Sequence, residues 1–531
     1  MIQKISQRLA WLGFLAIISV FSTSHIGSPG IVFQGSAGPY EILASIRPPD
    51  VVPGTAQVSV RVKDKGISSV YLQTVYFRHG GDTAPPAEEL QAIEGDEELY
   101  SGLTWLMAHG SSSVKIMVNG LQGEGSTVIP VPALATAQLE MDSNLEIVLL
   151  VLAFILFFGG ITIVAASIGE SLLKPGDKLS KRQKWKTGLV AVGSFAFFIW
   201  VMNMGIKWWN HEEGRYNRYM YKPVGISSEL SQVNEKKYLK IHLEDQGHID
   251  RRPGDLVPDH GKLMHVFMMS KENADHFAHV HPYKIDSVNY EVLLPEKLPA
   301  GDYRMFVDIV HESGLAETLV SELNIPSPVA KASMLSENKE VSLDKSDVDD
   351  SYYQQRTIKN NSQVLESGTK IIWDKAKNKK FKVGQIESLT FKVEDSNGLP
   401  AVLNPYMSML GHLAILKEDA KVFIHLHPIG TISMAAQEAL ANTLNEKVTI
   451  CLPLDSNSVA LDSLRFSEGL LDQNKVSTMR DDILKMMEEK GLSNEVSFPY
   501  AFPEAGKYRM WVQVRTQNGV ETAGFEVEVE E

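Results

Sequence analysis

Cysteine is almost absent from this chain of 531 residues, which holds one Cys against fifteen His. A single thiol, Cys451, cannot form an intramolecular disulfide, a Cys-x-x-Cys redox pair or a Cys-rich zinc site. Any metal chemistry must therefore depend on His, Met and carboxylate side chains. The chain also lacks an excess of basic charge, because its formal net charge is −14. Proteins that bind nucleic acid normally present a basic face, so no nucleic acid is expected as a partner.

Length and composition place the chain among multidomain globular proteins. At about 150 residues per domain, the length predicts three or four domains. A hydrophobic fraction of 44% with a charged fraction of 22% excludes global disorder. The mean hydropathy of −0.09 is that of a soluble protein. It is an average, however, and it conceals two apolar runs of membrane length.

The N-terminal segment, residues 1–24, has the order of a signal peptide. Basic residues come first, the apolar run 11–21 follows, and the small residues 22–24 end the segment. We expect export, with cleavage before His25. An uncleaved N-terminal anchor is the alternative.

Two uncharged apolar runs, 147–168 and 188–206, are each long enough to cross the hydrocarbon core of a bilayer as a helix. Neither run holds an ionisable side chain, so a proton relay or ion path is not expected and the pair is interpreted as an anchor. The connecting loop 169–187 is rich in Lys and Arg, which predicts that it is cytoplasmic. The flanking segments would then lie on the periplasmic side of the inner membrane.

Short β-rich runs separated by Gly, Pro and Asp fill residues 25–140, a spacing typical of a small antiparallel β-sandwich. The expected strands are 40–46, 57–62, 69–77, 114–118 and 127–131. Together with the segments below, the prediction is a mainly β protein with three β-sandwich domains and a two-helix transmembrane hairpin.

The two segments after the helices, 210–327 and 368–531, repeat one another and are called repeat 1 and repeat 2. A stretch rich in Ser, Lys, Asp and Glu, 328–367, separates them and is predicted to be a linker. Repeat 2 carries an insertion, 430–497, with helical patterns at 434–444 and 479–490. Three blocks match in order: 258–265 with 405–412, Phe277-Ala-His-Val-His-Pro282 with Phe423-Ile-His-Leu-His-Pro428, and Ala300-Gly-Asp-Tyr-Arg-Met305 with Ala505-Gly-Lys-Tyr-Arg-Met510.

The spacing of the histidines predicts that each repeat gathers three imidazoles. A hairpin with the two-residue loop Glu418–Asp419 would set His412 opposite His425. A three-residue loop in repeat 1, 271–273, would set His265 opposite His279. Because strand side chains alternate between faces, His281 and His427 join the same faces.

Neutral imidazole is a common ligand of zinc and copper, so each group of three could hold a transition-metal ion. Position 260 in repeat 1 corresponds to position 407 in repeat 2. The fourth ligand could come from His260 or Met264 in repeat 1, and from Met407 or Met409 in repeat 2. A His-rich site with a thioether option favours copper over zinc. The predicted metal ligands are His260, His265, His279, His281, Met407, His412, His425 and His427.

Other interpretations of these residues remain open. The His-x-His-Pro sequences could simply end two hairpins, in which case the protein would be an envelope interaction or assembly scaffold without metal. No nucleophile with a base recurs beside the histidines, so an enzyme is not expected. A blue-copper centre needs a thiolate, and Cys451 lies in the insertion. His311 has no counterpart in repeat 2 and is interpreted as a surface residue.

At its histidine blocks the chain resembles bacterial membrane proteins with YtkA-like or FixH-like exported β-sandwich domains. The resemblance rests on Asp255 to His265, on Phe277 to Pro282 and on Phe498-Pro-Tyr-Ala-Phe-Pro503. The beginning of the exported chain, His25 to Pro29 with Arg47-Pro-Pro49, is similar as well. The resemblance implies Ig-like or cupredoxin-like sandwiches and an association with copper handling or respiratory-oxidase assembly. Envelope or oxidase-assembly proteins would then be partners, besides the membrane.

Overall fold

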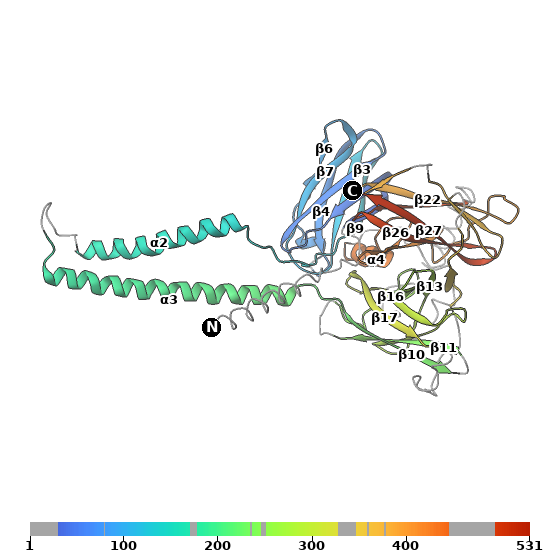
Figure 1. Ribbon diagram of the computed structural model, residues 1–531. Coiled ribbons are helices and arrows are strands. Elements are labelled where there is room, and N and C mark those ends of the chain that lie inside the picture. The colour runs from blue at the N-terminus through green and yellow to red at the C-terminus, as the bar shows by residue number, and fades with distance from the viewer. Residues whose placement is uncertain are drawn as a thin grey trace. The chain divides into compact units, whose positions relative to one another are not determined.

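The computed structural model (Figure 1) describes residues 30–169 except 79, and 178–233, 236–245, 251–327, 347–357, 361–375, 379–444 and 494–531. The predicted signal peptide, Cys451 and the helical pattern at 479–490 lie outside the described residues. The chain divides into two compact units, one with the β-sandwiches and one with the long helices (50–52 and 134–222). Each unit is considered by itself.

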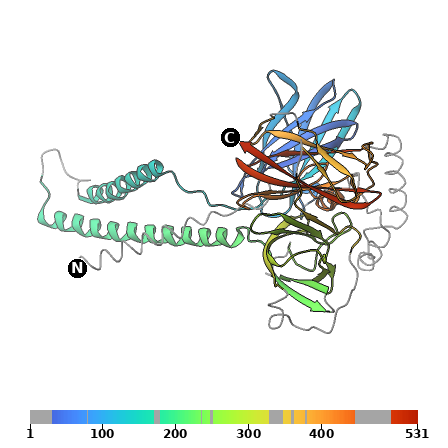
Figure 2. The same cartoon turned by 45° about the vertical axis from the view of Figure 1, so that its right-hand side comes forward.

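The first β-sandwich, shown in blue to cyan in Figure 2, consists of two antiparallel sheets. One sheet has the order β1-β2-β3-β7-β6 and the other β5-β4-β8-β9. The five strands expected from the sequence are confirmed as β2, β3, β4, β8 and β9. The bounds are β1 Ile31–Ala37, β2 Tyr40–Arg47, β3 Gly54–Val62, β4 Ile67–Tyr76, the short 3-10 helix Gly81–Thr83, β5 Glu88–Glu89, β6 Gln91–Ile93, β7 Asp96–Leu106, β8 Ser112–Gly120 and β9 Gly123–Pro130.

Two helices, α2 Ser143–Gly169 and α3 Lys181–Tyr219, contain the two apolar runs and are long and apolar enough to cross a membrane. They run alongside one another, with the rings of Phe157 and Phe195 5.5 Å apart. The predicted loop 169–187 is shorter than expected, because a capping box between Ser180 and Gln183 starts α3 within it.

Repeat 1 is a β-sandwich with sheet orders β10-β11-β15-β14 and β17-β16-β12-β13-β18. The last strand of the second sheet, β18, comes from the segment that the sequence predicts to be a linker. The bounds are β10 Gly225–Val233, β11 Lys236–Glu244, β12 His265–Ser270, β13 His276–Val280, β14 Tyr283–Lys284, β15 Asn289–Leu293, β16 Gly301–Val310, β17 Ala316–Ile325 and β18 Ser351–Gln354.

Repeat 2 has the sheet orders β19-β20-β22-β25 and β21-β27-β26-β23-β24. Its first strand, β19, also lies in the predicted linker, and the helix expected at 434–444 is present as α4. The bounds are β19 Ser362–Val364, β20 Lys370–Trp373, β21 Phe381–Lys382, β22 Ile386–Glu394, β23 His412–Lys417, β24 Phe423–Leu426, α4 Met434–Thr443, β25 Glu495–Ala501, β26 Gly506–Thr516 and β27 Gly519–Glu530.

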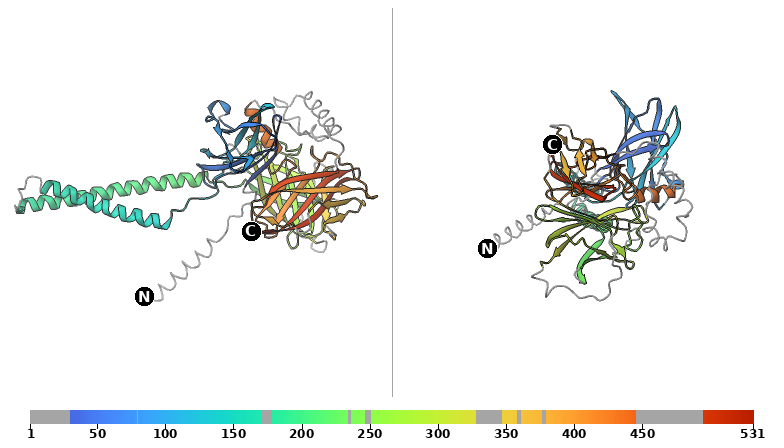
Figure 3. Two further views of the ribbon diagram at one scale, coloured as in Figure 1. Left: turned by 90° about the horizontal axis from the view of Figure 1, so that it is seen from above. Right: turned by 90° about the vertical axis from the view of Figure 1, so that its right-hand side faces the viewer.

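The five-stranded sheets of the two repeats pack against one another, as the yellow-green and orange-red layers of Figure 3 show. In β12, Val266 and Met268 point into the core of repeat 1, whereas Phe267 and Met269 belong to a separate apolar cluster shared with repeat 2. We call this shared cluster the inter-repeat core. Its described members are Phe267, Met269, Phe277, Phe306, Tyr353, Ala414, Leu416, Ala420, Phe423 and Trp511.

The inter-repeat core has approximate two-fold symmetry. Phe306 of repeat 1 stacks on Phe423 of repeat 2, with ring centroids 4.1 Å apart. The corresponding residues with the repeats exchanged are Trp511 and Phe277, which stack at 4.9 Å. The two repeats therefore present equivalent faces to each other, as the subunits of a symmetric pair do.

The turn after β24 connects repeat 2 to the first sandwich. The backbone of Gln34 in β1 donates to the carbonyl of Ile429, and Thr431 donates to the carbonyl of Val32. Helix α4 adds a bond from the Gln437 side chain to the carbonyl of Val128. The edge strand β1 is thereby covered by the chain that directly follows His427.

We expect Gly430→Ala to weaken this connection. Gly430 has φ +116°, and a Cβ there would lie 2.0 Å from the carbonyl oxygen of Val32. Gly519, with φ +101° and open space around it, is the matched control because the backbone strain is similar and the clash is absent. Overpacking predicts that Gly430→Ala destabilises by about 1–3 kcal/mol more than Gly519→Ala in thermal unfolding. Equal losses of unfolding free energy in the two variants would contradict the close approach of Gly430 to the Val32 carbonyl.

Candidate metal centre

The histidines of the two hairpins lie on the predicted faces, but the register differs from the prediction by two residues. His279 pairs with Phe267 rather than with His265, and His425 pairs with Ala414 rather than with His412. The loops are longer than expected, because Ala274 and Ala420 adopt positive φ and prolong the turns. A shift of two residues preserves the face, so the imidazoles still gather on one side of each sheet.

That side is the interface between the repeats, and the histidines of both hairpins form one cluster there. Seven imidazoles are buried, with exposed fractions from 0% for His279 and His412 to 7% for His425. Rings from different repeats approach closely. Between ring centroids, His260 lies 4.6 Å from His427, and His265 lies 5.4 Å from His425. The sequence predicts two separate sites, whereas the structure brings their residues into one buried cluster.

Within this cluster, two groups of three imidazoles have nitrogen atoms within 4.8 Å of one another. Site 1 consists of His265, His279 and His281 of repeat 1. Site 2 consists of His412 and His427 of repeat 2 together with His260 of repeat 1. The fourth-ligand candidate of repeat 1 thus lies with the histidines of the other repeat. His425 lies beside both groups, 5.2 Å from His412 and 5.8 Å from His279 between ring centroids.

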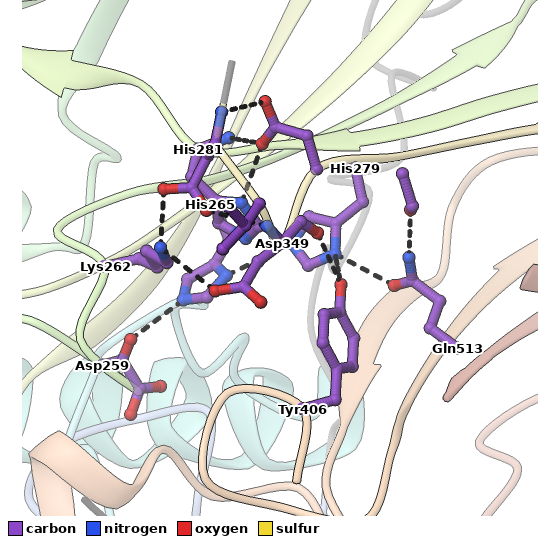
Figure 4. A network of polar contacts seen from close by, with 12 residues as sticks. Asp259, Lys262, His265, His279, His281, Asp349, Tyr406 and Gln513 are labelled. Carbon is purple, nitrogen blue, oxygen red and sulfur yellow. Dashed lines mark hydrogen bonds and ion pairs between the residues drawn. The ribbon is translucent and has the colours of Figure 1, made fainter. Parts of the chain in front are cut away.

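His279 and His425 each contact a polar side chain of the other repeat. Nδ1 of His279 lies 2.9 Å from Oε1 of Gln513, and Nδ1 of His425 lies 3.3 Å from Oδ2 of Asp308. Asp308 pairs with His265 and Gln513 pairs with His412, so they occupy the same position in the two repeats. Figure 4 shows Gln513 and Tyr406 of repeat 2 reaching His279 of repeat 1.

Several buried imidazole nitrogens have no hydrogen-bond partner, although they lie away from water. In the cluster these atoms are both ring nitrogens of His260 and His412 and Nε2 of His281, His425 and His427; outside it, both ring nitrogens of His311 also lack a hydrogen-bond partner. A buried polar atom without a partner is costly, so it calls for an explanation such as a bound ion. In contrast, Nδ1 of His427 contacts the carbonyl of Ile432 at 2.9 Å, and Nδ1 of His281 contacts Asp350 at 3.0 Å. These contacts fix the ring orientation and leave Nε2 available for a metal ion.

Burial keeps these imidazoles uncharged at neutral pH. It lowers the pKa of His265 and His427 to about 4, even though the nearby Asp259 carboxylate acts to raise both values. Burial also lowers the pKa of the other five histidines below the ordinary value for imidazole. A neutral imidazole has a free lone pair, which is the form that binds a metal ion.

Carboxylates surround the cluster on the side of repeat 1. His281 forms a third candidate group with Asp347 and Asp350, just before β18. The ammonium of Lys262 lies 2.6 Å from Asp347 of this group and 3.2 Å from the neighbouring Asp349, so Asp347 already has a cationic partner. The backbone carbonyl of Asp259 contacts Nε2 of His265, and its carboxylate accepts the backbone N–H of Ala435 at the start of α4.

The methionines considered as fourth ligands differ in their surroundings. Met264 belongs to the core of repeat 1, so it is not available as a ligand. Met407 and Met409 are buried but belong to the core of neither repeat among the described residues. His311, expected on the surface, is buried and lies 3.9 Å from Glu317, outside the candidate groups.

The matching family model is described as a domain of unknown function (DUF8832) and covers residues 222–325, 366–448 and 479–531. These segments contain most of each repeat and all seven histidines. No curated protein sequence matches the chain.

Several solved structures show weak similarity to the chain. An engineered protein is 17% identical with a TM-score of 0.13, over 15% of this chain and 17% of that one. The chain thus spans less than a fifth of that protein. A tetra-tandem repeat from the extending region of a large adhesion protein is 8% identical with a TM-score of 0.15, over 94% and 74% of the two chains. A mutant alpha-2-macroglobulin from Salmonella is 9% identical with a TM-score of 0.17, over 94% and 23%. Because these TM-scores are below 0.5, the site is interpreted from its own residues.

Proposed function

We propose that this protein is a membrane-anchored metal-binding protein and that the histidine cluster between its repeats binds copper for metal handling or sensing. The observation that carries the proposal is a set of buried, uncharged imidazoles. Every histidine of site 2 and His281 of site 1 has a nitrogen without a partner, and the other two histidines of site 1, His265 and His279, contact each other at 3.2 Å. A metal ion would supply the missing contact to each nitrogen without a partner. Imidazole donors with a nearby thioether favour copper over zinc and over harder ions.

A binding role accords better with the burial of the site than a catalytic one. A catalytic metal keeps an open coordination position that a substrate can reach. Here the seven histidines are at most 7% exposed, and two domains and helix α4 enclose them. We infer that the ion is bound and held, not used in turnover.

The proposed location is the inner membrane, with the β-sandwiches on the periplasmic side. Helices α2 and α3 have the length and apolarity for an anchor. Lys181, Arg182 and Lys184 at the start of α3 lie in the basic segment between the two apolar runs, and such segments favour the cytoplasm. The resemblance to YtkA-like and FixH-like exported domains supports the same orientation and makes envelope proteins of copper handling the proposed partners.

Metal analysis of the full chain in detergent tests the proposal. We expect about two copper ions per chain, because two of the candidate groups consist of three imidazoles each. The double variant His265→Asn/His281→Asn should lose one ion, and so should His412→Asn/His427→Asn. His311→Asn is the matched control, since His311 is equally buried but outside both groups. If the wild-type chain binds no copper in either oxidation state, the cluster serves only to join the repeats, as in a scaffold.

A further inference from the structure

The two candidate sites are related by the same approximate two-fold symmetry as the inter-repeat core. Exchanging the repeats converts His412 and His427 of site 2 into His265 and His281 of site 1. The ring distances agree: His412 and His427 are 5.2 Å apart, and His265 and His281 are 5.1 Å apart. The symmetry therefore extends from the apolar contacts to the imidazoles.

The third member of site 2, His260, crosses from the other repeat. It lies in a tight turn in which Asp259 and Lys262 exchange backbone hydrogen bonds, and it has φ +52°. The corresponding turn of repeat 2 joins Tyr406 and Met409 in the same way, and its second residue, Met407, has φ +47°. Met407 is thus the structural counterpart of His260, in backbone conformation as well as in sequence position.

His260 lies 5.1 Å from His412 and 4.6 Å from His427 between ring centroids. From the approximate symmetry we therefore expect the Met407 side chain beside His265 and His281. A second observation supports this placement. The hydroxyl of Tyr406, the residue before Met407, lies 3.4 Å from Nδ1 of His279, which belongs to site 1. Met407 is also 4% exposed and belongs to the core of neither repeat among the described residues.

We propose that Met407 is the fourth ligand of site 1, so that each repeat contributes one turn residue to the site of the other repeat. Site 1 then offers three imidazoles and a thioether, and site 2 offers imidazoles alone. A thioether selects Cu(I), so site 1 should favour the reduced ion more strongly than site 2 does. This inference rests on the proposed copper binding and makes the two sites chemically unlike.

X-ray absorption at the copper edge of the full chain, loaded anaerobically with Cu(I), tests the donor set. We expect a sulfur contribution in the wild-type protein that disappears in Met407→Leu. Met409→Leu, two residues away in the same turn, is the matched control and should keep the sulfur signal. The Cu(I) affinity of site 1 should fall in Met407→Leu by at least the roughly 10- to 100-fold that loss of a supporting group costs. Copper without a sulfur ligand in the wild-type chain would overturn the inference.

The double variants show which site holds the sulfur. The sulfur signal should survive in His412→Asn/His427→Asn and disappear in His265→Asn/His281→Asn. The opposite pattern would mean that Met407 serves its own repeat, which would overturn the exchange of ligands while leaving copper binding intact. Circular dichroism and thermal unfolding identify a variant that has lost its fold. If a histidine variant has lost its fold, the comparison of Met407→Leu with Met409→Leu, which both retain every histidine, shows whether Met407 binds the copper ion.

Discussion

Acidification is expected to destabilise the metal-free protein strongly between pH 6.5 and about 4. Each imidazole of the cluster has an ordinary pKa near 6.5 in the unfolded chain and a lowered pKa in the folded chain because of burial. In this pH range the unfolded state binds more protons than the folded state, so stability falls as pH falls. At 1.36 kcal/mol per pKa unit, His265 and His427 each contribute about 3 kcal/mol at the acid end.

Two largely buried carboxyl groups, with side chains 20% exposed for Asp308 and 9% for Asp350, oppose this effect. Burial raises the pKa of Asp308 to about 7 and that of Asp350 well above the ordinary value. As the pH falls below neutral, the folded state therefore binds a proton at each carboxyl before the unfolded state does, which stabilises the fold. The lowered imidazoles outnumber these carboxyls, which leaves a net loss of stability on acidification. Thermal unfolding in chelator from pH 7.5 to 4.5 measures it, and a bound metal ion should protect the fold by holding the imidazoles neutral. A midpoint independent of pH would show that the folded chain does not bury these groups uncharged.

Phe423→Ala is expected to cost about 3–5 kcal/mol, the range for removing a buried aromatic side chain. Phe423 is fully buried, but it points away from the core of its own repeat and stacks on Phe306 of repeat 1. The substitution should therefore separate the repeats before either sandwich unfolds. Hydrogen exchange should show lost protection in the edge strand β24, with the central strands of both repeats, β16 among them, still protected. Phe423→Ala should also weaken metal binding, since site 2 takes ligands from both repeats.

Phe391→Ala provides the comparison for this experiment. Phe391 is as deeply buried but belongs to the core of repeat 2. Its removal should unfold the sandwich itself, with loss of protection in β22 and β25. If the two variants gave the same exchange pattern, the repeats would unfold as one unit and the inter-repeat core would have no separate role.

Alternation along the strands was sufficient to predict which histidines share a face. It could not give the register, because that depends on the loops, and a positive φ at Ala274 and Ala420 is not evident from the side chain. Nor could it show that the two faces meet. The available signal was the unbroken apolar run in each central strand, Val266–Met269 and Leu413–Leu416, which indicates a strand buried on both faces.

Asp308 and Gln513 were also missed, although the repeats mark them. Each is a polar residue inside the apolar stretch that begins at the Met of the Tyr-Arg-Met block, 305–310 and 510–514, and each lies three residues after that Met. Polar side chains at matching interior positions indicate a shared buried function, here contact with His425 and His279. The linker prediction went too far for a related reason: β18 and β19 are short strands in a polar segment, and sheet pairing rather than composition forms them.

The two-fold relation between the repeats has a consequence for how unlike sites can exist in one protein. A chain with a single repeat could build this interface only by pairing with a second copy of itself, and symmetry would then give both copies the same turn residue. Covalent fusion of the two halves removes that constraint. With His260 in one half and Met407 in the other, a single polypeptide carries a heterodimer's asymmetry at fixed stoichiometry and needs no mechanism to sort its subunits.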